Sequence, residues 1–188
     1  TIFSETFDSD LGQFSQFSVA SDENWSQSTD GGDGFAAING FGADEASDDW
    51  LISSALDMSS TTSEELTADI GNEFGGPDLM VKVSTDYSGS GDPTGATWTE
   101  EATVGSAGSV TVDMSGYSGN SSVYVAFHYV SDGTGGGEAA DYQVDDVEVT
   151  SSENPIVRFA SATSSSAEDA GSTNLTVELS DGDTEVAV

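Results

Sequence analysis

Cysteine is absent from the chain, and basic residues are nearly absent. The 188 residues contain two basic side chains, Lys82 and Arg158, against 35 acidic ones, so the formal net charge is −33. Without cysteine there are no disulfides, thiolate zinc sites or cysteine nucleophiles. So negative a surface repels nucleic acid and anionic membranes, and no apolar run is long enough to span a bilayer. We therefore expect no nucleic-acid partner and no membrane insertion.

The acidity has three physical interpretations. High charge with few apolar residues is typical of disordered chains, but the aromatic residues and clear strand patterns argue against disorder over residues 1–150. A carboxylate-rich, lysine-poor surface also suits high salt, where ions screen its self-repulsion. Some carboxylates can instead bind divalent cations. We expect adaptation to high salt for the surface as a whole and cation binding at a few positions.

Helical periodicity is weak, whereas strand patterns recur along the chain. Serine, threonine, glycine and aspartate interrupt any long pattern of helical period. Alternating or apolar runs bounded by glycine-rich turns predict short strands instead. These runs lie at residues 1–8, 35–40, 49–58, 78–87, 109–115, 122–130 and 142–149. Many short strands between turn clusters predict an all-β fold, an antiparallel jelly-roll β-sandwich.

The residues after 150 differ from those before them. The stretch SSENP at 151–155 has the composition of a linker. Residues 156–188 carry two further strand patterns, too few for a sandwich of their own, because isolated strand pairs are marginally stable in water. We therefore predict one domain at 1–150, a linker, and a C-terminal strand-forming extension that belongs to a truncated second domain or pairs with another molecule.

Four stretches occur in an order that resembles a known domain family. They are ETFD, DDWLISSALDMS, VKVSTDYSGSGDPTGATWTE, and VYVAFHYV followed by YQVDDVEV. Over residues 1–150 they resemble the choice-of-anchor J domain, a jelly roll related to cleaved-adhesin and MAM-type modules. One departure is LISSALD, where the family often has proline after the first serine; it affects strand geometry and not chemistry. PIVRFASATSSSAEDAG and NLTVELSDG are similar to the beginning of a Calx-beta domain, too short to include its calcium loops.

The resemblance implies a module of an extracellular, multidomain protein. Such modules mediate adhesion, carbohydrate binding or attachment of a neighbouring enzyme, and they are not themselves catalytic. Related jelly rolls also hold a structural calcium ion between their terminal strands. The resemblance therefore implies a secreted or cell-surface location, with a glycan or a cell-surface protein as partner.

Two adjacent aspartates interrupt the last predicted strand of the domain. Side chains alternate between the faces of a strand, so Asp145 is predicted to face the core and Asp146 to face solvent. The same alternation places Glu5 of the first strand inward, between apolar neighbours. Buried carboxylates are costly unless they are compensated, and the chain has few cations to compensate them.

A bound Ca²⁺ would compensate these carboxylates with ligands of the type it prefers. We predict a structural calcium site with Glu5, Asp8 and Asp145 as ligands. Asp49, next to Asp48 at the start of a predicted strand, is a weaker candidate for a metal ligand. The alternatives are hydrated carboxylates at strand ends, a protonated carboxyl group, and, for the Asp48–Asp49 pair, a solvated turn.

Catalytic machinery is not evident in the sequence. His128 is the only histidine, and no GxSxG nucleophile motif accompanies it; we interpret it as a residue of a sheet face. Among the tryptophans, Trp50 is predicted to lie in the core, and the family resemblance implies that Trp98 packs at a strand start. Trp25, in the polar stretch SDENWSQS, is the candidate for an exposed ring that stacks on a sugar.

Together these observations predict a calcium-stabilised, non-catalytic module for adhesion or carbohydrate binding. The alternative is a structural subunit of an extracellular filament or surface layer. In that case an apolar strand such as NLTVEL would add to the sheet edge of a neighbouring molecule, and the C-terminal segment would mediate self-association.

Overall fold

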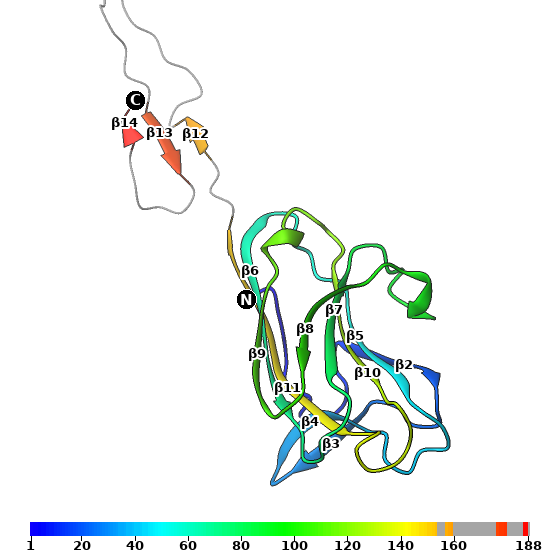
Figure 1. Ribbon diagram of the computed structural model, residues 1–188. Helices are drawn as coiled ribbons and strands as arrows, with labels where there is room; N and C mark the ends of the chain where they lie inside the picture. Colours follow the sequence, from blue (N-terminus) through cyan, green and yellow to red (C-terminus); the bar gives the residue numbers. More distant parts are fainter. Residues whose placement is uncertain (154–156, 160–175, 180–185, 188) are drawn as a thin grey trace, which may run out of the picture. The chain divides into compact units, whose positions relative to one another are not determined.

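The computed structural model describes residues 1–153, 157–159, 176–179 and 186–187, with side chains for residues 1–152. The chain divides into two compact units, Thr1–Ser152 and Glu153–Val188. We call the first the sandwich domain (Figure 1). Within the described part of the chain, no helix has the length and apolar character that a membrane crossing requires.

The sandwich domain consists of two antiparallel sheets (Figure 1). The sheet that we call the β4–β11 sheet has the order β3-β4-β11-β6-β9, with β1 paired to β11. The β5–β10 sheet has the order β2-β5-β10-β7-β8. The strands of the first sheet are β1 (Phe3–Glu5), β3 (Ser26–Asp30), β4 (Asp33–Asn39), β6 (Thr61–Gly71), β9 (Gly108–Asp113) and β11 (Asp141–Glu153). Those of the second are β2 (Phe14–Ala20), β5 (Asp48–Ser53), β7 (Leu79–Ser84), β8 (Thr99–Val104) and β10 (Tyr124–Val130).

Two short 3₁₀ turns, η1 (Pro93–Gly95) and η2 (Ser115–Tyr117), complete the sandwich domain. The predicted all-β antiparallel sandwich is confirmed. Because β11 continues to Glu153, the first part of the predicted linker, residues 151–153, is strand. In the C-terminal unit, β12 (Val157–Phe159), β13 (Thr176–Leu179) and β14 (Val186–Ala187) form a sheet with β13 in the middle.

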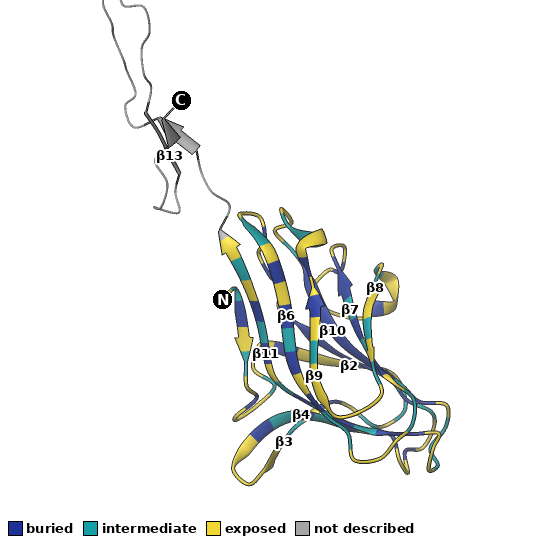
Figure 2. Cartoon of the chain, turned by 60° about the vertical axis from the view of Figure 1, so that its left-hand side comes forward, coloured by how far each residue is buried: buried dark blue, intermediate teal, exposed yellow. Residues whose placement is uncertain are grey.

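The core lies between the two sheets, because side chains alternate along each strand and every second one points between the sheets (Figure 2). Leu79, Val81 and Val83 of β7 all face the core, as predicted from their spacing. Phe14 contributes to an aromatic cluster, with ring centroids 5.5 Å from Phe3 and 5.3 Å from Phe7. Rings in this range of separations add to the stability gained from burying their apolar area.

The sequence patterns missed β6, the strand that runs beside β11. Its residues TTSEELTADIG bury Leu66, Ala68 and Ile70, but the same face also buries Glu64. Burial alone would raise the pKa of Glu64, yet hydrogen bonds from the hydroxyls of Ser118 and Thr61 hold that pKa below its usual value. A buried carboxylate is tolerated here because both of its oxygens accept hydrogen bonds.

Candidate functional site

The outer face of the β5–β10 sheet carries an aromatic cluster beneath the loop at 85–98. Trp50 of β5 lies with its ring centroid 5.2 Å from Trp98, and Tyr87 lies 5.5 Å from Trp98 and 5.2 Å from Tyr124. The Nζ atom of Lys82 lies 5.2 Å from the Trp50 ring centroid, in reach of a cation–π interaction. Trp50 is buried, as predicted, at 5 % exposed, but it lies in this outer cluster rather than in the main core. Trp98 packs against this cluster directly before β8, which agrees with its predicted place at a strand start.

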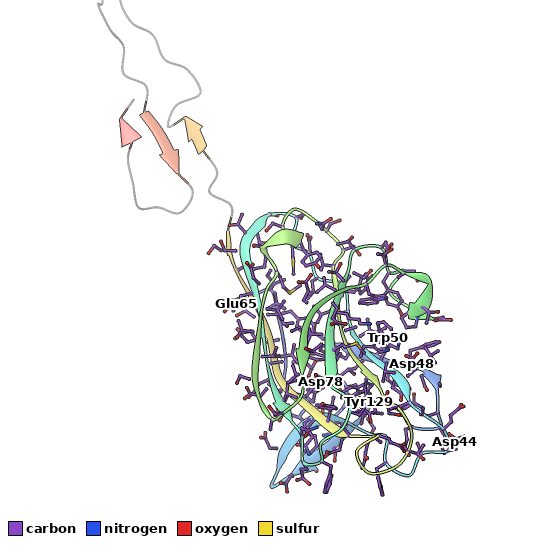
Figure 3. The ribbon with its side chains drawn as sticks, in the orientation of Figure 1. Asp44, Asp48, Trp50, Glu65, Asp78 and Tyr129 are labelled. Atoms are coloured by element: carbon purple, nitrogen blue, oxygen red, sulfur yellow. The ribbon has the colours of Figure 1, made fainter. Side chains whose placement is uncertain are left out.

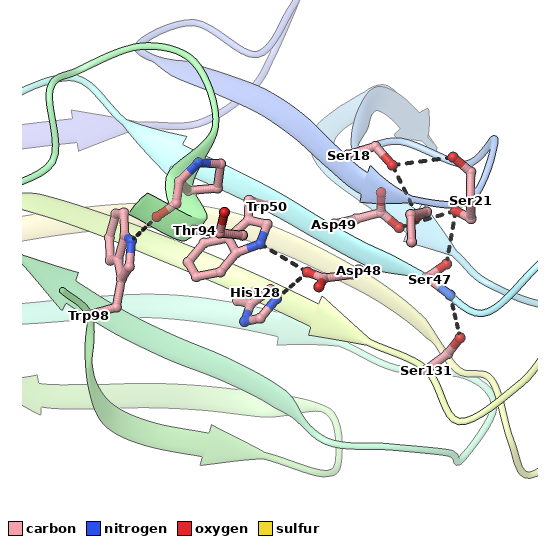
Figure 4. A network of polar contacts seen from close by, with 12 residues as sticks. Ser18, Ser21, Ser47, Asp48, Asp49, Trp50, Thr94, Trp98, His128 and Ser131 are labelled. Carbon is pink, nitrogen blue, oxygen red and sulfur yellow. Dashed lines mark hydrogen bonds and ion pairs between the residues drawn. The ribbon is translucent and has the colours of Figure 1, made fainter. Parts of the chain in front are cut away.

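His128 is locked into this cluster (Figure 4). Its ring stacks on Trp50 with centroids 3.7 Å apart, and its Nε2 lies 2.7 Å from Asp48 Oδ1. Trp50 Nε1 donates to the same oxygen at 3.0 Å. Burial lowers the pKa of His128 to about 4. Near neutral pH the ring is therefore uncharged, and Nε2–H donates to Asp48, which suits a structural role rather than proton transfer.

Asp49 faces the opposite side of β5 from Asp48, so the pair is divided between two environments (Figure 4). The Asp49 side chain is fully buried, and burial raises its pKa to about 6. Its Oδ2 has a long contact of 3.5 Å with Ser21 Oγ. Within the described residues, Oδ1 has no hydrogen-bond partner. Asp49 is therefore a buried carboxyl group whose neighbours are mainly serine hydroxyls, with little to stabilise its charged form.

Trp25 is not exposed, so its predicted role in stacking on a sugar is wrong. Its side chain is 2 % exposed and belongs to the main core, where Nε1 donates to the backbone oxygen of Asp49 at 3.3 Å. The polar neighbours in SDENWSQS are exposed or half-buried, while the indole ring, just before β3, is buried. The free energy gained by burying so large an apolar ring outweighs the polar character of the local sequence.

Asp145 does not face the core either, because β11 contains a bulge that alternation alone does not reveal. Tyr142 and Val144 are buried before the two aspartates, and Val147 and Val149 are buried after them. Asp146 has a left-handed backbone with φ of 47°. The strand pairs with β4 as far as Val144 and with β1 from Val147 onward. The extra residue leaves both aspartates outside the core, Asp145 half-buried and the following one exposed.

Glu5 is half-buried rather than enclosed in the core, and backbone amides compensate its charge. Its Oε1 accepts from the N–H groups of Thr6 and Phe7 at 3.2 and 3.1 Å, and its Oε2 accepts from that of Gln13 at 2.8 Å. Gly12 permits this close approach, since a Cβ there would lie 1.9 Å from Oε2. The first predicted calcium ligand thus holds the turn between β1 and β2.

Asp8 and Asp145 share an electrostatic environment. Burial raises the pKa of Asp145, and the negative charges of Asp146, Asp33 and Asp8 raise it further. Asp33 and Asp145 also border one hollow, of about 260 Å³. Within residues 1–152, however, no group of three or more acidic or histidine side chains is arranged to hold a metal ion. The calcium site with ligands Glu5, Asp8 and Asp145 therefore stays a prediction, as does metal binding at Asp49.

A second feature lies at one end of the sandwich, where three loops meet. These are the connections at 40–47, 72–78 and 131–140, which we call the loop end. Phe41 and Phe74 project from two of these loops with 64 % of each residue exposed. They border a mainly apolar hollow of about 210 Å³, which we call the Phe41–Phe74 hollow. Its other lining residues are Asn39, Gly75, Gly136, Gly137, Ala139, Ala140 and Asp141.

The polar residues that line the hollow hold both exposed phenylalanines by their backbones. The Phe41 N–H donates to Asn39 Oδ1 at 2.9 Å, and the Phe74 N–H donates to Asp141 Oδ1 at 2.8 Å. The hydroxyl of Tyr129, labelled in Figure 3, donates to the backbone oxygen of Ala140 at 2.9 Å. The backbone of each exposed phenylalanine is therefore held by a hydrogen bond from its own N–H group.

Sequence reasoning missed this hollow because it concentrated on tryptophan. The signal was present in the dipeptides Phe41–Gly42 and Phe74–Gly75, each a large apolar residue beside glycine in a polar loop. A glycine has no side chain that could cover the ring beside it, and a large exposed apolar residue in so polar a chain indicates a binding surface.

No family model matches the sequence, and no curated protein matches it. Solved structures do resemble the chain. The K1 cleaved adhesin domain of Lys-gingipain from Porphyromonas gingivalis W83 is similar with a TM-score of 0.61 and 17 % identity, over 79 % of this chain and 96 % of that one. The K2 domain of Lys-gingipain gives 0.56 and 18 %, over 79 % and 97 %.

A third similar structure is the CBM22-1 xylan-binding domain of Xyn10C from Paenibacillus barcinonensis. Its TM-score is 0.51 at 14 % identity, over 81 % of this chain and 95 % of that one. At identities this low the likeness establishes the fold alone. The adhesin-like β-sandwich is thereby confirmed, whereas the resemblances to the choice-of-anchor J and Calx-beta domains stay predictions.

Proposed function

We propose that the chain is a non-catalytic binding module of an extracellular protein, with a glycan or a cell-surface protein as its ligand. The observation that carries this proposal is the pair of exposed phenylalanines at the loop end. Exposed aromatic rings around an apolar hollow are typical of binding sites on otherwise polar surfaces. The similar folds include adhesin and xylan-binding domains, which supports the same class of function.

The state of His128 supports a non-catalytic role. A general base works best with a pKa near the operating pH, whereas burial lowers the pKa of this histidine to about 4. Its ring is stacked on Trp50 and its Nε2 is held by Asp48. An enzyme that used the chain's single histidine for proton transfer would first have to release it from both contacts.

This function is tested by binding of the complete chain, at several salt concentrations, to a glycan array and to intact cells. We expect saturable binding to at least one polysaccharide or cell surface. The Phe41→Ser/Phe74→Ser variant should bind more weakly, and Val19→Ser, which removes a 43 % exposed apolar residue on β2, should not. A wild-type chain that binds neither glycans nor cells would contradict the proposal.

We further propose that Asp8 and Asp145 contribute to a structural calcium site at the corner formed by β1 and β11. Their mutual repulsion would be relieved by a divalent cation, for which carboxylates and backbone carbonyls are suitable ligands. Calcium at about one hundred times its dissociation constant would add about 2.7 kcal/mol to the free energy of unfolding.

We therefore expect EDTA to lower the melting temperature and added calcium to restore it. Asp145→Asn should abolish this response. The matched control is Asp146→Asn, because asparagine tolerates the left-handed backbone at that position. A melting temperature that EDTA leaves unchanged, with no calcium found by elemental analysis, would rule the site out.

The filament alternative gains no support from the described strands. It requires a free edge on the NLTVEL strand, yet β13 pairs with β12 through Val157↔Leu179 and with β14 through Val177↔Val186. The other residues of the C-terminal segment lie outside the described ranges. Self-association of this segment stays a prediction.

A further inference from the structure

The size of the Phe41–Phe74 hollow limits what it can hold. Its volume of about 210 Å³ lies below the roughly 300–1,000 Å³ typical of pockets for drug-sized ligands. It is bordered by loops and by the ends of β4 and β11 rather than enclosed between the sheets, so a chain molecule can pass over it and leave one unit inside. This geometry suits a single small ring, or one side chain, of a larger ligand.

The lining combines apolar surface with two unused polar groups. Phe41 and Phe74 provide exposed ring faces, while glycine and alanine residues leave the floor open. In the described residues, Asn39 Nδ2 and Asp141 Oδ2 make no hydrogen bond; Asn39 Oδ1 accepts from the Phe41 N–H, and Asp141 Oδ1 accepts from the N–H groups of Glu73 and Phe74. A free amide NH2 group and a free carboxylate oxygen match hydroxyl groups, which both donate and accept.

Charge narrows the ligand class further. Asp141 lines the hollow, and Glu73 and Glu138 are chain neighbours of its lining residues. An anionic ligand would be repelled here, as by the whole chain. The acidic side chains would attract a cation, but the positively polarised N–H groups of the Asn39 amide would repel it. Phenylalanine is also a weaker cation–π partner than tryptophan. A neutral ring that carries hydroxyl groups fits the volume of the hollow, its apolar and polar lining, and its negative charge.

We propose that the Phe41–Phe74 hollow is a subsite for one uncharged pyranose ring of a glycan. The apolar face of the sugar lies against the phenylalanines, and its hydroxyls accept from Asn39 Nδ2 and donate to Asp141 Oδ2. Because both loops are held by hydrogen bonds before the ligand arrives, little ordering is needed on binding. The subsite rests on the proposed binding function and assigns it a ligand class and a location.

The test is an NMR titration of the isotope-labelled complete chain. The probes are the methyl glycosides of β-glucose, β-galactose and α-mannose, the uronate counterpart of whichever binds best, and choline. We expect at least one neutral glycoside to shift the amide resonances of Phe41, Phe74 and Gly136. The uronate should bind roughly tenfold more weakly, and choline should leave these resonances unchanged.

Two kinds of variant separate the subsite from effects on folding. Phe41→Ser and Phe74→Ser should each weaken the best probe roughly tenfold, whereas Val19→Ser should not. Gly75→Val should block the hollow, because Gly75 lines it and the valine side chain would stand beside the proposed ring site. The fold should tolerate this change, because a Cβ at Gly75 meets nothing within 4 Å. Gly116→Val, which is equally unobstructed but lies in η2, is the matched control.

Each other outcome overturns the inference in a distinguishable way. Glycan binding that shifts only amides outside the loop end would leave the proposed function standing and remove the subsite. Choline binding at Phe41 and Phe74 without any neutral glycoside would replace the sugar by a cation. If no probe shifts the loop end while polysaccharides or cells still bind, the subsite is wrong; if these fail as well, the proposed function is wrong too.

Discussion

Replacement of Trp25 by alanine should lower the free energy of unfolding by about 3–5 kcal/mol. Its indole is 2 % exposed and packs within the main core of the sandwich domain. The truncation leaves a large cavity and removes the hydrogen bond from Nε1 to the backbone oxygen of Asp49. Since domains are typically stable by about 5–15 kcal/mol, this single change removes a large part of the total.

Urea denaturation of the purified variant measures this loss directly. Phe41→Ala is the control: it also truncates an aromatic residue, but one that is 64 % exposed, so it should cost less than about 1 kcal/mol. The opposite result would support the prediction from the sequence that Trp25 is an exposed ring that stacks on a sugar. In that case Trp25→Ala would keep its stability and lose ligand binding.

Replacement of Asp49 by asparagine should make the domain strongly sensitive to acid. Burying neutral His128 contributes stability that is present above its unfolded pKa of 6.5 and lost as pH falls to its folded pKa of about 4. Asp49 acts in the opposite direction. Its pKa is raised from 3.8 to about 6, so its contribution is present at low pH and lost as pH rises through 6.

In the wild-type chain the two groups therefore nearly cancel between about pH 4 and 6. Each shift corresponds to roughly 3 kcal/mol, at about 1.4 kcal/mol for each pKa unit. Asp49→Asn removes the group that opposes the pH dependence of His128. The free energy of unfolding of this variant should fall by about 3 kcal/mol between pH 6.5 and 4, where that of the wild type changes little. The carboxylates with lowered pKa, such as Asp86 and Asp113, act mainly below this range.

Urea denaturation at pH 4.5 and 7 compares the wild type with Asp49→Asn and with Asp49→Asn/His128→Asn. The double variant should again be nearly independent of pH in this range, because it lacks the two groups whose pKa values are shifted most within it. A single variant with the same pH profile as the wild type would show that these two groups do not control stability in this range.

The sequence predicted best those strands whose burial follows a simple period. In β10, Val125, Phe127 and Tyr129 face the main core, while Tyr124 and His128 face the outer cluster. β6 was missed because serine, threonine and glutamate dominate it, and its pairing in the middle of a sheet depends on distant neighbours. Local propensity carries no information about such pairing.

The candidate sites were harder to predict than the strands. The rule that side chains alternate between faces placed Asp145 wrongly, because Asp146 has a left-handed backbone. This one residue shifts the alternation of all later residues of β11 by one position. Phe41 and Phe74 lie 33 positions apart in the sequence, and only the meeting of two loops brings them to one hollow. Adaptation to high salt concerns the stability of the protein in different salt solutions, which the fold does not reveal. It therefore stays a prediction.

We propose that the loop end of the sandwich domain binds a glycan. Saturation-transfer NMR with the polysaccharide that binds most strongly tests it most directly, with the wild type and the Phe41→Ser/Phe74→Ser variant compared at equal concentration. We expect strong transfer from the wild-type protein to the apolar face of one sugar ring, and its loss in the variant. Equal transfer from both proteins would contradict this location of the binding site.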